Sequence, residues 1–341
     1  MNPCPREALL KLIAMLRSSA GIAHKRDIDG VMRALKRLPL MNNAAAGAVA
    51  LGDDCAAIAD GDGYLLLAIE GFLNQFVGQE PWFAGYCGVM VNVSDIYAMG
   101  GRPLAVVDAL WSRDGAAAQA ILDGLMAASH TYQVPIVGGH SNRRNDREQL
   151  SVAILGRAKC LLTSFDARPG QNLVLAIDLR GRFHEPHAYW DASSAAPAQR
   201  LRDDLALLPD IAEAGLSKAA KDVSMAGILG TALMLLECSG IGALIDVAAI
   251  PCPDGVALER WLTVFPSYGF LLSVADEHLA AVLERFAARE LACATIGRTD
   301  ASHLVRLQHG DAIETLWDFG QEALIGCAPA KLATLHQSGG L

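Results

Sequence analysis

Two adjacent acids, Asp53 and Asp54, stand at the entrance of a short apolar run in the sequence Gly52-Asp53-Asp54-Cys55-Ala56. Two carboxylates this close repel each other unless a cation or hydrogen-bond donors compensate their charge. Hard divalent ions such as Mg²⁺ prefer carboxylate oxygens, with water and phosphate oxygens in the remaining coordination positions. The segment is therefore a candidate magnesium site, although a solvated Asp-Asp turn has the same local sequence.

A third acid, Glu70, ends the apolar run 65–69 and is followed by Gly71. A carboxylate just past a buried strand lies where ligands commonly meet a sheet. The alternative for Glu70 is an ordinary exposed acid.

Asn92 and Asp95 are the strongest candidates, because they fall within a helix expected over residues 81–99. Spacings of three and four residues place them on one helix face with Gly88 and Met99. A buried polar group without a partner costs about 1–3 kcal/mol, so each side chain is expected to have one. That partner is either a metal ion with a nucleotide or merely a backbone group, and the spacing does not separate the two.

Gly138 and Gly139 follow a brief strand expected at residues 135–137, which we expect to end at these glycines. Backbone without side chains can approach a ligand closely. The next residue, His140, can hydrogen-bond a phosphate or orient a water. A tight turn that carries a surface histidine is the alternative.

Lys221, Asp222 and Ser224 precede a long apolar helix expected at residues 224–238. Ser224 is expected to be its N-cap, and the free amides beyond such a cap can hold an anion. Capping accounts for Ser224, but it does not explain why Lys221 and Asp222 stand together.

These residues are distributed over two halves of similar length. The polar, turn-prone segment 163–172 predicts a boundary between an N-terminal part, residues 1–162, and a C-terminal part, residues 163–341. Both halves mix helices with strands. We expect helices at residues 5–17, 27–38, 81–99, 116–130, 200–208, 224–238 and 277–288, and strands at 55–59, 64–69, 104–110, 135–137, 150–155, 173–178, 243–247, 268–274 and 292–296.

Composition excludes several classes of protein. With 52% hydrophobic residues, most of the 341-residue chain is expected to fold, and the formal charge of −9 without a basic run argues against nucleic-acid binding. The eight cysteines are scattered singly, which indicates small apolar fillers in a reducing compartment and not a zinc site. No membrane span or secretion signal is expected, so the sequence predicts a cytoplasmic protein.

Taken in order, these segments resemble the superfamily of aminoimidazole ribonucleotide synthetase, thiamine-monophosphate kinase and selenophosphate synthetase, and within it the AIR-synthase-related proteins. The string Asn92-Val-Ser-Asp-Ile-Tyr-Ala-Met-Gly-Gly-Arg-Pro103 is the most specific match. The resemblance implies an N-terminal α/β domain whose sheet pairs with that of a second subunit, and a C-terminal α+β domain. It also implies ATP and Mg²⁺ in the cleft between the domains.

The resemblance assigns roles residue by residue. It implies that the metal is held by Asp53, Asp54, Glu70, Asp95 and Asp222, that Asn92, Gly138, Gly139, His140 and Ser224 face the nucleotide, and that His140 and Lys221 steady phosphate oxygens during catalysis. The implied activity is phosphoryl transfer to a small-molecule acceptor, or activation of an amide or carboxyl oxygen by transient phosphorylation.

The chain also departs from the family pattern. Glu70 stands where the family usually has aspartate, His140 stands where thiamine-monophosphate kinase has an acid, and Met225-Ala226-Gly227 replaces a second aspartate. These departures keep open the alternative of a nucleotide-binding partner or scaffold without turnover. A further alternative is that the carboxylates only stabilise loops.

Overall fold

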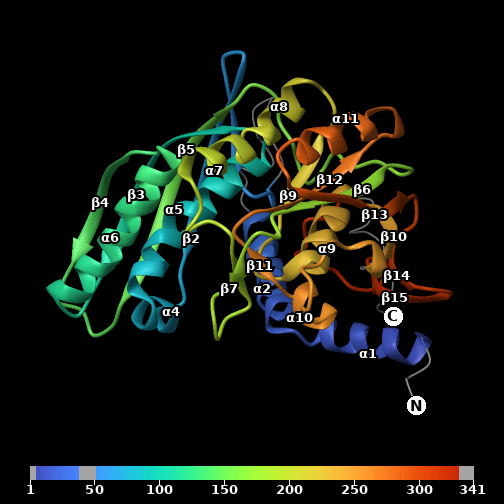
Figure 1. Ribbon diagram of the computed structural model, residues 1–341, viewed down its shortest axis with the longest axis horizontal. Coiled ribbons are helices and arrows are strands. Elements are labelled where there is room, and N and C mark those ends of the chain that lie inside the picture. The colour runs from blue at the N-terminus through green and yellow to red at the C-terminus, as the bar shows by residue number, and fades with distance from the viewer. Residues whose placement is uncertain (1–4, 38–50, 330–341) are drawn as a thin grey trace. The chain divides into compact units, whose positions relative to one another are not determined.

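The computed structural model describes residues 5–37 and 51–329, which separate into two compact units (Figure 1). Unit 2 comprises Asp54–Leu161 and Ser193–Glu213, and unit 1 comprises Met1–Asp53, Leu162–Ala192 and Ala214–Leu341. The chain passes from unit 2 to unit 1 after Leu161. The N-terminal segment nevertheless belongs with the C-terminal half, because the apolar side of its first helix, Pro5–Arg17, packs on the last strand of unit 1.

Unit 2 is built on a five-stranded sheet with the order β1-β2-β5-β3-β4, in which only β3 and β4 pair in parallel. Its elements are β1 (Ala56–Asp60), β2 (Gly63–Gly71), α4 (Asn74–Gln79), α5 (Pro81–Ala98), β3 (Arg102–Trp111), α6 (Gly115–Tyr132), β4 (Ile136–Asn142), β5 (Gln149–Ala158), α7 (Ala198–Leu205) and α8 (Leu207–Glu213).

Helix α5, which carries Asn92 and Asp95, begins at Pro81 as the sequence predicts and ends at Ala98, one residue before the predicted end. Pro81 occupies the start of the helix, where its missing N–H is not needed. Gly100 follows the last turn with a φ of +74°. Glycine adopts this left-handed conformation with little strain, and the helix ends there. Almost every residue from Phe83 to Ala98 is buried between α6 and the sheet.

The two faces of the five-stranded sheet differ. Leu66, Val106 and Val152 lie on the face that packs against α5 and are buried. The opposite face is open among the residues that the structure describes, and its apolar side chains Leu67 and Ile69 are exposed. The strand register assigns the remaining residues to these two faces.

Unit 1 is built on a seven-stranded sheet with the order β15-β14-β10-β13-β6-β12-β9 and a small sheet β11-β8-β7. Its elements are α1 (Pro5–Arg17), α2 (Ala20–Leu35), β6 (Asn172–Ile177), β7 (Arg182–Phe183), β8 (Tyr189–Asp191), β9 (Ala219–Asp222), α9 (Gly227–Ser239), β10 (Gly242–Asp246), η1 (Val247–Ala249), α10 (Leu258–Leu262), β11 (Phe265–Pro266), β12 (Gly269–Val274), α11 (Asp276–Ala287), β13 (Ala292–Asp300), β14 (Leu304–His309) and β15 (Ala312–Asp318).

The central strands β6 and β12 are buried along their whole length, so both faces of this sheet are covered. Leu175 and Leu271 belong to the core that contains Leu229 and Leu233 of α9. Helix α11 packs on β6, β12 and β13 and buries Val282 and Phe286.

Four local predictions are wrong. The helix expected at 27–38 is α2, which begins at Ala20 after the N-cap Ser19; residue 38 lies outside the described residues. Strand β4 continues through the two glycines expected to end it. Ser224 is not the N-cap of α9; Ala226 is, and the Ser224 backbone N–H donates to Thr231 Oγ1 (3.1 Å). The segment expected to lead into α9 instead contains strand β9, where Lys221 and Asp222 pair with β12.

Within residues 5–37 and 51–329, no helix combines the length and the apolar character that a membrane span requires.

Candidate metal and nucleotide site

Asp54 and Asp95 meet in unit 2. Asp54 immediately precedes Cys55 and β1, while Asp95 projects from the last turns of α5. Their carboxylates offer oxygens within 4.8 Å of each other; Asp95 is buried and Asp54 is half-buried. Two like charges at this separation in a partly buried place favour a compensating cation. An all-oxygen donor pair fits Mg²⁺, which takes one or two protein carboxylates and completes its shell with water and phosphate oxygens.

Asn92 lies one turn before Asp95 on the same helix and is fully buried. Its Nδ2 donates to the Gly88 carbonyl oxygen at 2.8 Å, so the amide nitrogen has the backbone partner that was one of the two sequence hypotheses. Its Oδ1 is buried and accepts no hydrogen bond from the part of the chain that the structure describes. A buried acceptor of this kind has the chemistry to take a donor from a ligand or a bound water.

Glu70 and Asp108 lie on the α5 side of the sheet. The register aligns Glu70 of β2 with Val152 of β5, and Val152 with Asp108 of β3, so all three side chains share one face. Val152 is fully buried, and a Cβ added to Gly88 of α5 would lie 2.9 Å from its Cγ2. Both acids therefore lie on the sheet face that packs against α5; Glu70 is exposed there, as one of its two sequence interpretations had it, and Asp108 is half-buried.

Asp108 was not singled out from the sequence. The sequence does show an acid in the middle of the apolar run 104–110. Because side chains alternate between the faces of a strand, this acid is expected on the same face as Val106 and Leu110. Partial burial raises the pKa of the Asp108 carboxyl, and a hydrogen bond from its own backbone opposes that shift. The Asp108 carboxylate also explains Gly139, because a Cβ there would lie 2.6 Å from Asp108 Oδ2.

His140 lies on the opposite, open face. Gly139 pairs with Asp108, and His140 pairs with Ala109, so successive residues of β4 alternate between the two faces. The His140 ring packs beside Trp111 with ring centroids 5.8 Å apart, and it is exposed. The structure thus separates His140 from the face that carries Glu70, while Gly138 shares the side of His140.

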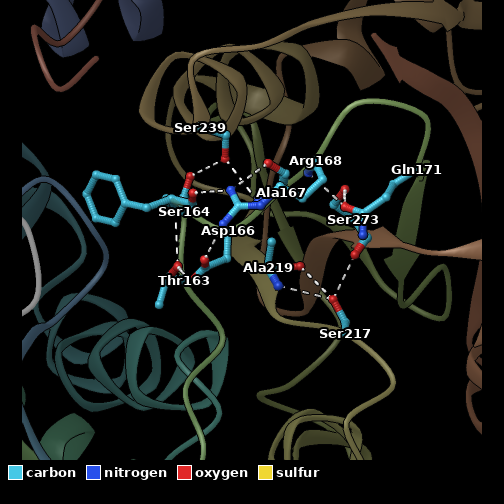
Figure 2. A network of polar contacts seen from close by, with 11 residues as sticks. Thr163, Ser164, Asp166, Ala167, Arg168, Gln171, Ser217, Ala219, Ser239 and Ser273 are labelled. Carbon is cyan, nitrogen blue, oxygen red and sulfur yellow. Dashed lines mark hydrogen bonds and ion pairs between the residues drawn. The ribbon is translucent and has the colours of Figure 1, made fainter. Parts of the chain in front are cut away.

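Asp53 belongs to unit 1, where both of its carboxylate oxygens accept hydrogen bonds from Ser164. Ser164 N donates to Oδ2 at 2.7 Å, and Ser164 Oγ donates to Oδ1 at 2.6 Å. Ser164 itself is held by Ser239, whose Oγ donates to the Ser164 carbonyl at 2.7 Å and accepts from Ala167 N at 3.2 Å (Figure 2). Asp53 therefore fixes the segment that leads into β6.

That segment continues as a polar network. Figure 2 shows that Thr163 Oγ1 donates a hydrogen bond to the Asp166 carboxylate, and that Arg168 forms an ion pair with the same aspartate. Further along, Ser273 Oγ donates to Gln171 Oε1 at 2.7 Å. The turn-prone stretch expected from the sequence is thus an ordered loop stabilised by its own side chains.

Lys221 and Asp222 are buried neighbours on β9 and point to opposite faces of the unit 1 sheet. Lys221 pairs with Leu271 and so lies on the α9 side, whereas Asp222 pairs with Phe270. Ser224, predicted to face the nucleotide, has a buried Oγ that lacks a hydrogen-bond partner among the described residues.

Two family descriptions match this chain. "AIR synthase related protein, N-terminal domain" matches residues 52–158, and "AIR synthase related protein, C-terminal domain" matches residues 181–310. Together these ranges cover more than half of the chain.

The sequence is similar to several curated proteins. An uncharacterized protein of Synechocystis sp. is 48% identical over 93% of this chain and 98% of its own length. A thiamine-monophosphate kinase of Pyrococcus abyssi is 28% identical over 83% of this chain and 93% of its own length. A selenide, water dikinase of Aeromonas hydrophila is 26% identical over 68% of this chain and 72% of its own length.

Two solved structures show the same fold. PurL of Thermotoga maritima complexed with ATP has a TM-score of 0.69 at 19% identity, over 87% of this chain and 49% of that chain. AaThiL complexed with AMPPCP and TMP has a TM-score of 0.62 at 20% identity, over 84% of this chain and 95% of that chain. This chain thus spans about half of the PurL chain and most of the ThiL chain.

Proposed function

Because this chain belongs to the AIR synthase related protein family, we propose that it binds ATP with Mg²⁺ and transfers a phosphoryl group to a small-molecule acceptor. The product is a stable phosphorylated acceptor, or an amide or carboxyl oxygen of the acceptor is activated by transient phosphorylation. The family and the two-domain fold expected from the sequence are confirmed. Relatives with known names include ATP-using kinases, which supports nucleotide binding here.

The observation that carries the proposal is the pair of carboxylates, Asp54 and Asp95, within 4.8 Å of each other. In this proposal they hold Mg²⁺, which when bound neutralises charge on the β- and γ-phosphates. Asn92 offers its buried Oδ1 to the same layer, and Glu70 and Asp108 add negative charge that favours a cation there. The metal roles of Asp53 and Asp222, and the phosphate roles of Lys221 and Ser224, stay predictions.

Titration calorimetry tests the binding step. Asp95→Asn is expected to weaken Mg-ATP binding at least ~10-fold, which corresponds to about 1.4 kcal/mol. Asp123→Asn, on an exposed turn of α6, is the matched control and should bind normally. Unchanged affinity in Asp95→Asn would contradict the role given to that carboxylate.

A second candidate is a nucleotide-binding scaffold without turnover. It is favoured by the position of His140, a residue predicted to be catalytic, on the face of the sheet opposite Glu70. Incubation with ATP, Mg²⁺ and a mixture of metabolites separates the two functions. Steady ADP production that requires an added metabolite supports the enzyme, and tight binding without product supports the scaffold.

We also propose that the protein is a homodimer formed through the open face of the five-stranded sheet. Leu67 and Leu155 are directly paired there, and Ile69 and Val107 flank Ala153 in the next row. All four large side chains are more than a third exposed. A contiguous exposed apolar face of this kind is typical of a subunit interface.

A further inference from the structure

Two cysteines of unit 1, distant in sequence, converge on Gly52. Cys238 lies in the last turn of α9, and its Sγ is 3.8 Å from the Gly52 carbonyl oxygen. Cys327 follows β15, and a Cβ added to Gly52 would lie 2.3 Å from its Sγ. The two thiols are near enough to shift each other's pKa, and both side chains are buried.

The C-terminal segment that carries Cys327 is held in register with α9. The buried Glu237 carboxylate accepts hydrogen bonds from the backbone N–H groups of Leu324 (3.1 Å), Ile325 (2.8 Å) and Gly326 (3.1 Å). Lys36 Nζ donates to the Gly326 carbonyl oxygen at 2.7 Å. These contacts on the residues adjoining both cysteines keep the two sulfurs together.

The surroundings make the two thiols unequal. The interaction with the Cys238 thiol lowers the pKa of Cys327; burial and the charge of Glu237 oppose this shift, while the positive charges of Lys36 and Lys221 add to it, and the net direction is downward. The same interaction, together with burial, raises the pKa of Cys238. For Cys293, burial raises the pKa to about 12. Because the thiolate is the reactive form, Cys327 is the expected nucleophile and Cys238 its resolving partner.

We propose that Cys238 and Cys327 form a reversible disulfide when the protein meets a hydroperoxide. The Cys327 sulfur attacks the peroxide, the O–O bond breaks, and a sulfenic acid forms with release of water or an alcohol. The Cys238 sulfur then displaces the sulfenic hydroxyl as water, so two thiols are oxidised by two electrons and the peroxide is reduced. A dithiol reverses the reaction. This inference is independent of the proposed phosphoryl transfer.

The disulfide would tie the C-terminal segment covalently to the end of α9. Closing a loop of about 90 residues restricts the unfolded chain, so we expect the melting temperature of the oxidised protein to rise by roughly 5 °C. The added bond acts beside Gly52, next to the Asp53 carboxylate that fixes Ser164.

Peroxide titration of the full chain tests the proposal. Reduced protein is treated with one equivalent of hydrogen peroxide, blocked with N-ethylmaleimide, digested without reductant and mapped by mass spectrometry. We expect a peptide that links Cys238 to Cys327, lost on treatment with dithiothreitol, in the wild type and in the matched control Cys293→Ser. Absence of that peptide in the wild type would overturn the proposal, as would preferential linkage of any other pair.

Single variants assign the two roles. Cys238→Ser should leave Cys327 as a sulfenic acid that a dimedone probe traps, whereas Cys327→Ser should leave Cys238 unlabelled. Labelling of Cys238 in Cys327→Ser at the rate seen for Cys327 would contradict the assignment. Circular dichroism of each variant checks that it folds, and Cys327→Ala replaces a serine variant that does not. A disulfide that forms without any rise in melting temperature would overturn the predicted stabilisation of the oxidised protein.

Discussion

The two large sheets of this protein differ in how completely the chain itself covers them. In the seven-stranded sheet of unit 1, β6 and β12 bury every residue, between α9 and α11. In the five-stranded sheet of unit 2, one face is buried under α5 and the other is open, so Leu66 is 0% exposed and Ile69 is 69% exposed. Among the described residues, the central strands of the first sheet are buried on both faces, whereas the second sheet presents apolar side chains on one exposed face.

The candidate metal pair, Asp54 and Asp95, belongs to the unit with the open sheet. Asp95 is carried by α5, whose other residues are mostly apolar and buried, so the helix holds the carboxylate rigidly. In unit 2 the helix that covers one face of the sheet therefore provides much of the core and also positions Asp95. The open face carries His140 and neither Asp54 nor Asp95.

The largest expected effect comes from the covered sheet. Phe270→Ala in β12 removes a fully buried ring and should lower the free energy of unfolding by about 3–5 kcal/mol. Leu67→Ala, on the open face of β2, is the matched comparison and should cost less than about 1 kcal/mol in the isolated subunit. Urea unfolding measures both, and equal costs would break the contrast between the sheets.

The next effect concerns the C-terminal segment of the covered unit. Glu237→Gln leaves one acceptor oxygen for three backbone N–H donors and should cost about 2 kcal/mol, because charge-assisted hydrogen bonds are lost in a buried place. Glu284→Gln, on the exposed side of α11, is the control. Thermal unfolding compares the stability of the two variants. If Glu237→Gln loses no more stability than Glu284→Gln, the Glu237 carboxylate does not stabilise the C-terminal segment as proposed.

The open face is tested through the oligomeric state. Ile69→Glu places a charge on the apolar surface and should raise the dimer dissociation constant at least ~10-fold, or about 1.4 kcal/mol. Ile313→Glu, an exposed position in β15 of unit 1, should leave association unchanged. Sedimentation velocity over a concentration series distinguishes the outcomes. A dimer that survives Ile69→Glu would show that the open face is not the interface.

The smallest expected effect is a dependence on pH. Hydrogen bonds from Arg298 and Asn172 lower the pKa of Asp276 to about 2. Because the folded pKa lies below the unfolded value, the stabilisation is present above about pH 4 and is lost as pH falls toward 2. The melting temperature of Asp276→Asn should therefore fall less than that of the wild type between pH 5 and pH 3. Equal falls in melting temperature would contradict the lowered pKa of Asp276.

The sequence predicted the parts whose signals are local. Pro81 and Gly100 bound α5, and the spacing of Asn92 and Asp95 put both side chains on one face of it. The β1–β2 hairpin likewise follows from its glycine-aspartate turn. The family followed from the order of several motifs together.

The missed parts depend on distant partners. Strand β9 is four residues long and is paired with β12, so the sequence around Lys221 and Asp222 showed only that these residues precede a helix. Strand β4 runs through Gly139 because it pairs with β3, and position 139 has no room for a side chain because Asp108 of β3 lies beside it. His140 and Glu70 lie on opposite faces because of the register of four neighbouring strands. Residue spacing within one strand carries no information about that register.

Binding of Mn²⁺, a paramagnetic substitute for Mg²⁺, tests most directly whether Asp54 and Asp95 form a cation site. Electron paramagnetic resonance measures free Mn²⁺ as it is titrated into the wild type with a non-hydrolysable ATP analogue, and into Asp54→Asn/Asp95→Asn with the same analogue. We expect the wild type to take up Mn²⁺ beyond what the nucleotide alone binds, and the double variant to lose that excess while Asp123→Asn keeps it. Equal uptake by the wild type and a folded double variant would contradict the central claim.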